Sequence, residues 1–231
     1  MQRTTQWYPS FAEHTFPTVF LRLTADEIQV IKDDSANPAV KKHLEERLQQ
    51  AMNSLIGKSF IALDSCAPTD AADFAKGKAQ NTATGAIKLL QSSDKIRTAL
   101  KNGDKHIVIR PYRRMDKTRE FRLFIADGEL KAMSQYCLER HFRRLEGRRA
   151  EFWQKGLDFA QEIIPFLDGE KAVIDIYFTS DKRTLIVDFN EWAGETSPLL
   201  LRDWERDWNE AAGLKLINPP HKLGGDVKVS F

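Results

Sequence analysis

The sequence has little cysteine, no long apolar run and almost no excess of either charge. Its two cysteines, Cys66 and Cys137, stand far apart and form no CxxC pair, which argues against a disulfide or zinc framework. No apolar run approaches the ~18 residues that cross a bilayer, and the N-terminus lacks the pattern of a signal peptide. A net charge of +2 is too small to indicate nucleic-acid binding. We therefore expect a soluble, cytoplasmic protein.

Glycine-rich phosphate-binding motifs are also absent. Neither the P-loop pattern nor GxGxxG occurs, so side chains and a covering loop would have to hold any phosphate. GxSxG is missing too, which excludes the usual serine hydrolase motif. What is present is enough apolar sequence for a core, because 42% of the 231 residues are hydrophobic. A chain of this size builds one large domain or two lobes.

The first hundred residues predict two helices and two short strands. Asn37 and Pro38 form a helix start, and a four-residue apolar spacing continues to Gly57: Val40, Leu44, Leu48, Met52 and Leu55. The runs SFIAL (59–63) and AIKLL (86–90) indicate strands, and Ser92, Ser93 and Asp94 are candidate N-caps for a helix over roughly 94–101.

From residue 105 onward strands dominate the pattern. HIVIR (106–110) alternates, residues 120–136 form a hairpin around Asp127-Gly128, and residues 171–192 form a second hairpin. An amphipathic helix over 147–167 lies between the two hairpins, and 197–208 is typical of a helix that packs Trp204 and Trp208 onto the lobe. The mixture predicts an α+β fold with an N-terminal lobe (1–104) and a C-terminal lobe (105–231).

Each strand of the last hairpin carries one aspartate among apolar residues. If the apolar faces of both strands point to the core, residues 174, 176 and 178 pair with 189, 187 and 185. This register places Asp175 directly opposite Asp188, with Asn190 on the same face. Opposed like charges destabilise a sheet unless a cation lies between them or one carboxylate holds a proton.

The ligand atoms of this pair are all oxygens. Two carboxylates and an amide suit Mg²⁺ or Mn²⁺, with phosphate and water completing the coordination. The alternative is that both aspartates face solvent at a sheet edge. The apolar neighbours Val173, Tyr177 and Ile186 on the same face argue against that alternative.

The Asp-Gly hairpin predicts a basic face. A two-residue loop pairs Ala126 with Glu129, Phe124 with Lys131 and Arg122 with Met133. The core face is then formed by Phe121, Leu123, Ile125, Leu130 and Ala132. The opposite face shows Glu120, Arg122, Lys131 and Gln135, and Arg110 comes from the strand just upstream. Taken alone, such a basic face either binds phosphate groups or is an ordinary solvated surface. Together with the Asp175–Asp188 pair on the next hairpin, it indicates a site for a nucleotide and a metal ion.

An ordered series of motifs resembles the cell division cycle protein 123 family. It covers roughly residues 60–205, and WYPSF (7–11) is similar as well. The motifs are CAPTDA (66–71), LLQSSDKI (89–96), IVIRPY (107–112), EFRLFI (120–125), MSQY (133–136), VIDIYF (173–178), IVDFNEW (186–192) and TSPLLL (196–201).

The resemblance implies an ATP-grasp fold whose two α+β lobes close on ATP and Mg²⁺. It implies that Asp175, Asp188 and Asn190 are the metal ligands and that Arg122 contacts phosphate. It also places Arg110, with the hinge residues Pro111 and Tyr112, along the nucleotide. Eukaryotic members of the family are assembly chaperones that bind the gamma subunit of translation initiation factor 2, which implies a protein partner in the translation machinery.

The chain departs from the family pattern at three positions. Ala62 and Gln91 stand where the family has lysines, so we consider Lys58 and Lys88 as substitutes for the α/β-phosphate contact. Glu191 replaces the proline of the family's Asn-Pro pair and could add a carboxylate to the site.

Three functions remain open at the level of sequence. The first is an ATP·Mg²⁺-binding assembly factor, and the second an ATP-grasp ligase that forms an acyl phosphate, with Glu191, Glu195 or Thr196 positioning the acceptor. The third is a glycoside hydrolase, for which directly opposed aspartates are poorly placed. Whether ATP is turned over stays open.

One basic stretch, residues 136–149, has its own alternatives. It forms a surface for RNA or an acidic partner, or it is a solvated loop and helix start, which the near-neutral total charge favours. By resemblance this loop covers the nucleotide, so Arg140 or Arg143 could reach phosphate.

Overall fold

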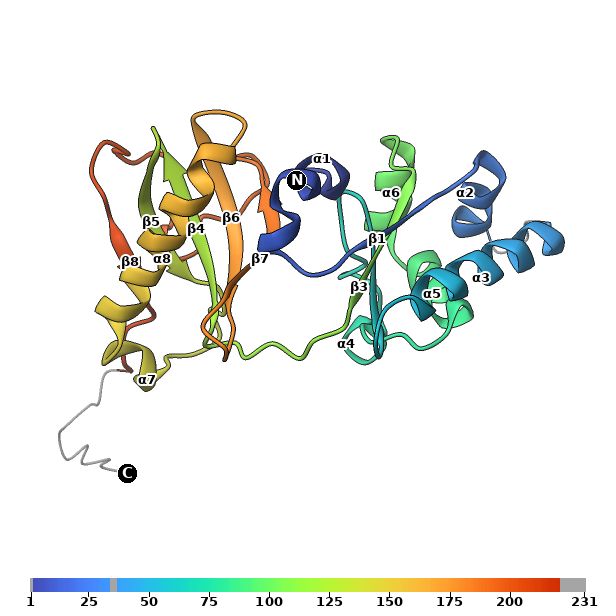
Figure 1. The fold of residues 1–231 in the computed structure, drawn as a ribbon, viewed down its shortest axis with the longest axis horizontal. Coiled ribbons are helices and arrows are strands. Elements are labelled where there is room, and N and C mark those ends of the chain that lie inside the picture. The colour runs from blue at the N-terminus through green and yellow to red at the C-terminus, as the bar shows by residue number, and fades with distance from the viewer. Residues whose placement is uncertain (1, 34–36, 221–231) are drawn as a thin grey trace, which may run out of the picture.

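The structure is a computed structural model that describes residues 2–33 and 37–220. Two antiparallel-rich sheets form two lobes that lie side by side; helices cover the smaller sheet on the side away from the other lobe, and one long helix crosses a face of the larger sheet (Figure 1). The smaller sheet has the order β1-β3-β2, and the larger has the order β7-β6-β4-β5-β8. No helix in the described ranges is long and apolar enough to cross a membrane.

The N-terminal lobe is a three-stranded sheet under a layer of helices. Its strands are β1 (Val19–Arg22), β2 (Ser59–Leu63) and β3 (His106–Pro111). Its helices are α2 (Ala25–Lys32), α3 (Pro38–Asn53), α4 (Phe74–Gly77), α5 (Ala83–Gln91) and α6 (Asp94–Lys101). The predicted helix start at Asn37 is confirmed, because the Asn37 side chain accepts a hydrogen bond from the N–H of Ala39. The helix ends at Asn53, one turn before the predicted end at Gly57.

The predicted strand AIKLL is wrong, because these residues lie in helix α5. Thr82 caps this helix by accepting a hydrogen bond from the N–H of Gly85. Ala86, Ile87 and Leu90 recur at helical spacing and are fully buried against the other helices. A short apolar run fits a buried helix as well as a strand, and here the preceding cap residue was the better signal.

The C-terminal lobe packs one long helix against its five-stranded sheet. The strands are β4 (Glu120–Ala126), β5 (Glu129–Gln135), β6 (Lys171–Phe178), β7 (Thr184–Asn190) and β8 (Gly213–Lys215). The helices are α7 (Arg143–Glu146) and α8 (Arg149–Ile163), followed by the 3₁₀ turn η2 (Ile164–Phe166). The predicted helix over 147–167 is therefore confirmed in its central part. Apolar side chains of α8 and the sheet form the main core of this lobe.

The predicted register of the last hairpin is correct at its centre and wrong at its turn end. Ile174 pairs with Phe189 and Asp175 with Asp188, as expected. A bulge after Asp175 then pairs Ile176 with Ile186 instead of Val187. Ile186 consequently enters the core, whereas the predicted core residues Leu185 and Val187 stay partly exposed.

A bulge also alters the Asp-Gly hairpin. Ala126 pairs with Glu129 as predicted, but a shift after Phe124 moves Arg122 opposite Ser134. Met133 therefore reaches the core under α8, while Ala132 joins Phe124 on the other face of the sheet. Phe121, Leu123, Ile125 and Leu130 do lie in the core as predicted.

The predicted boundary between residues 104 and 105 does not coincide with the division between the sheets. Strand β3, expected in the C-terminal lobe, pairs with both β1 and β2. The chain leaves the N-terminal lobe after Pro111 and reaches β4 through a linker over residues 112–119 (Figure 1).

The N-terminal segment, residues 2–18, contacts both lobes. Helix α1 (Thr4–Phe11) buries Trp7 and Phe11 in the core of the C-terminal lobe, followed by η1 (Ala12–His14). The main chain and hydroxyl of Thr5 donate to the Asp64 carboxylate of the N-terminal lobe, at 2.8 and 2.6 Å. Thr15 donates to the carbonyl of Ile186 on β7 at 2.7 Å. This segment therefore holds the lobes together opposite the linker (Figure 1).

Residues 197–208 do not form the predicted helix. They contain only the 3₁₀ turn η3 (Leu199–Leu201), followed by irregular chain. Trp204 and Trp208 nevertheless pack on Phe124 as expected of a covering segment, with ring centres 5.6 and 5.8 Å away. Local acidic and basic residues disrupt an apolar stripe here, and tertiary packing determines the conformation.

Candidate functional site

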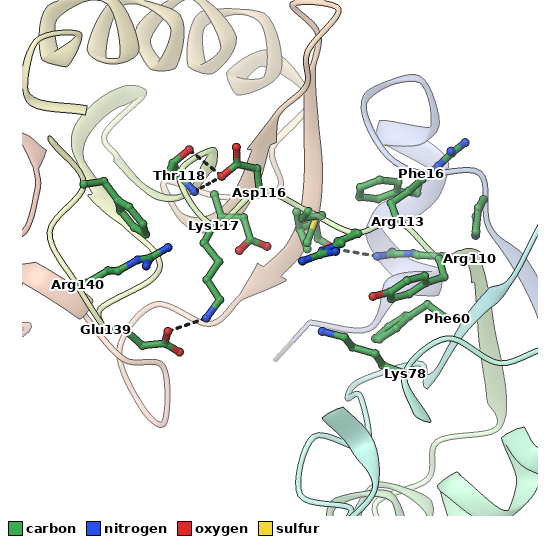
Figure 2. Close-up of a pocket in the computed structure, with 17 residues that line it drawn as sticks. Phe16, Phe60, Lys78, Arg110, Arg113, Asp116, Lys117, Thr118, Glu139 and Arg140 are labelled. Atoms are coloured by element: carbon green, nitrogen blue, oxygen red, sulfur yellow. Dashed lines mark hydrogen bonds and ion pairs between the residues drawn. The ribbon is translucent and has the colours of Figure 1, made fainter. Parts of the chain in front are cut away.

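A cleft with a volume of about 1110 Å³ lies between the two lobes. Figure 2 shows its walls: Phe16, Phe60 and Lys78 come from the N-terminal side, and Glu139 and Arg140 come from the opposite side. The linker residues from Tyr112 to Thr118 line it as well. A cleft of this size between two lobes can enclose a nucleotide.

Basic side chains outnumber acidic ones in the lining of the cleft. The basic residues are Lys78, Arg110, Arg113, Arg114, Lys117 and Arg140, and the acidic residues are Asp116, Glu120 and Glu139. The aromatic residues Phe16, Phe60, Tyr112 and Phe142 complete the lining. Aromatic rings and cations together suit a ligand with a planar base and negative charge.

The linker offers main-chain groups to the cleft. The N–H of Tyr112 donates to the carbonyl of Lys58 at 2.7 Å, which fixes the beginning of the linker on the N-terminal sheet. In the part of the chain that the structure describes, the main-chain groups of Arg113, Arg114 and Met115 form no hydrogen bond. Unpaired main-chain donors and acceptors of this kind can recognise the edge of a base.

A row of polar residues crosses the C-terminal sheet. Arg122 on β4, Asp175 on β6 and Asp188 on β7 occupy neighbouring register positions. Nε and Nη2 of Arg122 donate to the two oxygens of Asp175 at 2.7 and 2.8 Å, and Nη1 donates to the carbonyl of Ser197. Arg122 and Asp175 are only 5% and 7% exposed, so this is a buried bidentate ion pair.

Asp188 lacks a comparable cationic partner. Its Oδ1 accepts one hydrogen bond, from the N–H of Phe189 at 2.9 Å. Burial, followed by the negative charge of Asp175, raises the pKa of Asp188 to about 7. Asn190 donates through Nδ2 to Asp175 at 3.0 Å, which leaves the amide oxygen as its possible ligand atom. The predicted opposition of the two carboxylates is thus present.

Burial and the negative charge of Asp175 also raise the pKa of two neighbouring side chains, Glu120 and Tyr136. Burial and the Asp175 carboxylate raise the pKa of Glu120, against the positive charges of Lys117 and Lys78. Burial and Asp175 also raise the pKa of Tyr136 to about 12. The site therefore holds more negative charge than Arg122 alone offsets, and a bound cation would relieve it.

Arg110 links the row of acids to the cleft. Its guanidinium lies 5.3 Å from the ring centre of Trp7, and Nη1 donates to the carbonyl of Val187 at 2.8 Å. Burial lowers the pKa of Arg110, although Asp188 opposes this effect. Its Nη2 is buried without a hydrogen-bond partner among the described residues. A buried guanidinium with a free donor at the cleft is suited to an incoming anion.

The donor set fits a hard divalent cation only in part. Asp175, Asp188 and Asn190 supply oxygens alone, as Mg²⁺ prefers, and the charge of Asp175 contributes, after burial, to the raised pKa of Asp188. Both oxygens of Asp175 are engaged by Arg122, and no group of three or more His, Cys, Asp or Glu within residues 2–33 and 37–220 is placed to hold a metal. A phosphate ligand would complete such a site, as is usual for Mg²⁺.

Four predicted nucleotide contacts and the three predicted metal ligands are absent from the lining of the cleft: Lys58, Lys88, Gln135 and Arg122, and Asp175, Asp188 and Asn190. The side chains of Lys58 and Lys88 are exposed, and Lys88 lies on α5 in the outer helix layer. Gln135 is buried and donates to the carbonyls of Cys137 and Arg140 at 2.5 and 3.1 Å, so it orders the loop after β5. The β5 bulge explains this placement, because it changes the faces on which Lys131 and Gln135 lie.

Lys78 is one of four basic lining residues that no sequence pattern predicted, together with Arg113, Arg114 and Lys117. It follows the short helix α4, lines the cleft and has no ion pair among the described residues. Arg110, Pro111 and Tyr112 line the cleft as well, and their position along a nucleotide stays a prediction. No motif marks Lys78 in the sequence, because only the turn of the chain after α4 brings it to the cleft.

The fold and the site define a two-lobed α+β protein with a charged interlobe cleft. Cdc123 from Schizosaccharomyces pombe has this fold: its structure superposes with a TM-score of 0.76 at 22% identity, covering 88% of both chains. A C-terminally truncated form gives 0.79 at 20% identity, covering 92% of this chain and 93% of the other. The predicted α+β fold, which the resemblance gives as ATP-grasp, is confirmed.

Residues 36–213 match the model of the D123 family, and the chain belongs to this family. A CDC123-like protein of Acanthamoeba polyphaga mimivirus is 25% identical over 94% of this chain and 72% of its own length. A translation initiation factor eIF2 assembly protein of Xenopus laevis is 28% identical over 78% of this chain. The chain spans only 59% of the length of that Xenopus protein.

Proposed function

We propose that this protein binds ATP with Mg²⁺ in the interlobe cleft and acts as a nucleotide-dependent assembly factor for a protein of the translation machinery. The Arg122–Asp175–Asp188 row on the C-terminal sheet, next to the cleft-lining residues Glu120 and Val187, is the observation that carries this proposal. A crowded pair of carboxylates beside basic and aromatic lining residues is the arrangement that a metal-bound polyphosphate requires.

Each part of the nucleotide has suitable partners in this proposal. Phe60, Tyr112 and the unpaired main chain of the linker hold the base. Arg110 and Lys78 contact phosphate from the N-terminal side, and Arg122 contacts it from the C-terminal sheet. Asp175, Asp188 and the amide oxygen of Asn190 hold Mg²⁺ or Mn²⁺, which would neutralise the negative charge of the phosphates.

The partner follows from the named relatives. The Xenopus laevis and Danio rerio relatives are translation initiation factor eIF2 assembly proteins, 28% and 26% identical to this chain. We propose that this protein likewise binds a subunit of a translation initiation factor, and that it does so in the cytoplasm. Gel filtration of a mixture with purified eIF2 subunits, with and without ATP and Mg²⁺, tests the partner; co-elution with none of the subunits would contradict it.

No observation specifically favours the ligase alternative. Its acceptor residues Glu191, Glu195 and Thr196 follow β7 and, like the Arg122–Asp175–Asp188 row, are absent from the lining of the cleft. A ligase also needs an acceptor pocket beside the terminal phosphate. Phosphate release in the presence of carboxylate and amine acceptors is the measurement that would restore this alternative.

Thermal melting with nucleotides tests the central proposal. ATP with Mg²⁺ at 100 times its dissociation constant should stabilise the protein by about 2.7 kcal/mol, and AMP should stabilise it less. Asp175→Asn and Asp188→Asn should each abolish the part of the gain that depends on Mg²⁺. Asp26→Asn, an exposed substitution on α2, is the matched control and should keep the full gain. An unchanged Mg²⁺-dependent gain in both site variants would refute the proposal.

A further inference from the structure

Positive charge is concentrated at the mouth of the cleft. We define the mouth patch as linker residues 113–117 and loop residues 139–144, which together contain six basic and two acidic side chains. This net charge of +4 exceeds the +2 of the whole chain, so the remaining residues carry a net charge of −2. The low total charge therefore hides a strongly basic surface.

The patch surrounds a second pocket of about 420 Å³ next to the main cleft. Its lining contains Asp116, Thr118, Arg140, His141, Phe142, Arg143 and Arg144. Four of these residues also line the main cleft, so the two pockets are continuous: Asp116, Thr118, Arg140 and Phe142. The Arg122–Asp175–Asp188 row contributes no residue to the outer pocket.

Both acidic side chains of the patch are already neutralised. Arg144 donates to Asp116 and to the hydroxyl of Thr118, and Lys117 pairs with Glu139 at 2.7 Å (Figure 2). These two ion pairs tie the linker to the loop after β5. The patch therefore keeps its four other guanidinium groups without a carboxylate within ion-pair distance among the described residues: Arg113, Arg114, Arg140 and Arg143.

Contacts to the rest of the protein hold the loop after β5 in place, which an exposed run of charged residues would lack. Arg140 stacks over Phe142, with its guanidinium 5.0 Å from the ring centre, and its carbonyl accepts a hydrogen bond from the buried Gln135. A guanidinium held in place loses less conformational entropy when it binds a carboxylate through two parallel bonds.

Exposed apolar side chains beside the patch favour a polypeptide over RNA. Leu138 is 46% exposed and Tyr136 is 41% exposed, and both stand in the same loop. An aliphatic side chain next to arginines suits a peptide with mixed acidic and apolar residues. A nucleic-acid surface would need a longer basic track, whereas the rest of this chain is net acidic.

We propose that the mouth patch docks an acidic polypeptide segment of the partner protein. The segment places carboxylates against Arg140 and Arg143 and an apolar side chain against Leu138. Arg140 lines both pockets. A ligand bound in the main cleft would therefore change the affinity of the mouth patch for the partner. This inference rests on the proposed function for the existence of a partner, but its test does not require nucleotide.

Fluorescence anisotropy with a defined peptide tests the docking site. The probe is a labelled 12-residue peptide of repeating Glu-Glu-Leu-Ser units, and the comparison peptide has glutamine for glutamate. We expect the acidic peptide to bind at least tenfold more tightly, and its affinity to fall as NaCl rises from 50 to 300 mM. Arg143→Glu and Arg140→Glu should each weaken binding at least tenfold.

Lys42→Glu is the matched control, because Lys42 is highly exposed on α3 in the outer helix layer of the other lobe. It should change peptide affinity less than twofold. An equal loss with Lys42→Glu, or equal binding of both peptides, would overturn the inference. Tighter binding of a labelled 12-nucleotide RNA, lost with the same two arginines, would also overturn it in favour of a nucleic-acid surface.

The outcomes separate this inference from the proposed function. Peptide binding that depends on Arg143, in a protein that ATP and Mg²⁺ do not stabilise, would support the docking site and contradict the nucleotide site. Stabilisation by ATP and Mg²⁺ without any peptide binding would contradict the docking site alone. Melting curves of the two arginine variants verify that each is folded.

Discussion

Each lobe contains a pair of aspartates, all buried except the partly buried Asp188, and the two pairs differ in their surroundings. In the N-terminal lobe, Asp64 accepts hydrogen bonds from Thr5, and Asp104 accepts them from Ser65 and Arg3. In the C-terminal lobe, Asp175 has a buried arginine, while Asp188 faces it with a single main-chain donor.

The comparison shows that burial alone does not mark a functional acid. Asp64 and Asp104 are 3% and 2% exposed, less than Asp175 at 7%, yet each accepts several hydrogen bonds that connect segments of the fold. The C-terminal pair is distinguished by crowding, because Arg122 is bonded to Asp175 alone and leaves Asp188, directly opposite, with one main-chain donor. An incomplete set of partners is therefore the better sign of a ligand site.

The largest expected loss of stability comes from removing the guanidinium of Arg122. Arg122→Ala leaves Asp175 buried without a counter-ion opposite Asp188, which should lower the free energy of unfolding by about 3–5 kcal/mol. Urea denaturation measures this loss. Arg122→Ala combined with Asp175→Asn should recover most of it, because the unpaired charge is then absent. A loss of the same size in the double variant would show that the ion pair is not the cause.

The pH dependence of stability sharpens the contrast between the pairs. The pKa of Asp188 is raised to about 7 in the folded state, so its contribution is favourable at low pH and is lost as pH rises towards 7. The unfolding free energy attributable to this residue should fall by roughly 2 kcal/mol between pH 5 and 7 in EDTA. Asp188→Asn should remove this fall, whereas Asp104→Asn should not; an unchanged slope in Asp188→Asn would contradict the assignment.

The lysine of the cleft should matter for ligand affinity and not for stability. Lys78→Ala should weaken ATP binding about tenfold, or ~1.4 kcal/mol, because it removes a positive charge from the lining. Lys58→Ala and Lys88→Ala are the controls, since both side chains are exposed away from the lining. Isothermal titration calorimetry measures the ATP affinity of the three variants. A greater loss of affinity in Lys88→Ala than in Lys78→Ala would show that Lys88, as the sequence suggested, contacts phosphate.

The smallest effect tests the architectural role of the N-terminal pair. Thr5→Val removes the 2.6 Å hydrogen bond from the hydroxyl to Asp64 and should cost about 1 kcal/mol in the free energy of unfolding. ATP affinity should remain within twofold of the parent. A large change in affinity with little change in stability would show that this pair also serves the ligand.

Alternation along the strands was sufficient to predict the position of the C-terminal pair. Because side chains alternate with a period of two, the apolar sets around Ile174 and Phe189 fixed the register at Asp175 and Asp188. The same argument failed beyond the two β-bulges, because one extra residue in a strand moves the side chains that follow it to the opposite face of the sheet. Val187 and Gln135 were therefore assigned to the wrong sides, and no sequence pattern announced either bulge.

Other parts of the cleft depend on contacts between segments far apart in sequence. Lys78 reaches the cleft only through the path of the chain around α4, and Trp7 supports Arg110 across more than a hundred residues. Such contacts arise from tertiary packing, which local propensity does not encode. The site was thus predictable where one hairpin contains it and unpredictable where two lobes meet.

The N-terminal segment also has a mechanical consequence. With the linker on one side of the gap and residues 2–18 on the other, the lobes are joined at two separated points (Figure 1). Two lobes joined at two points can rotate only about the line through those points. We therefore expect the cleft to open and close in a single plane, without a twist of one lobe against the other. Pairs of spin labels across the gap should then change their separation along that direction alone when a ligand enters.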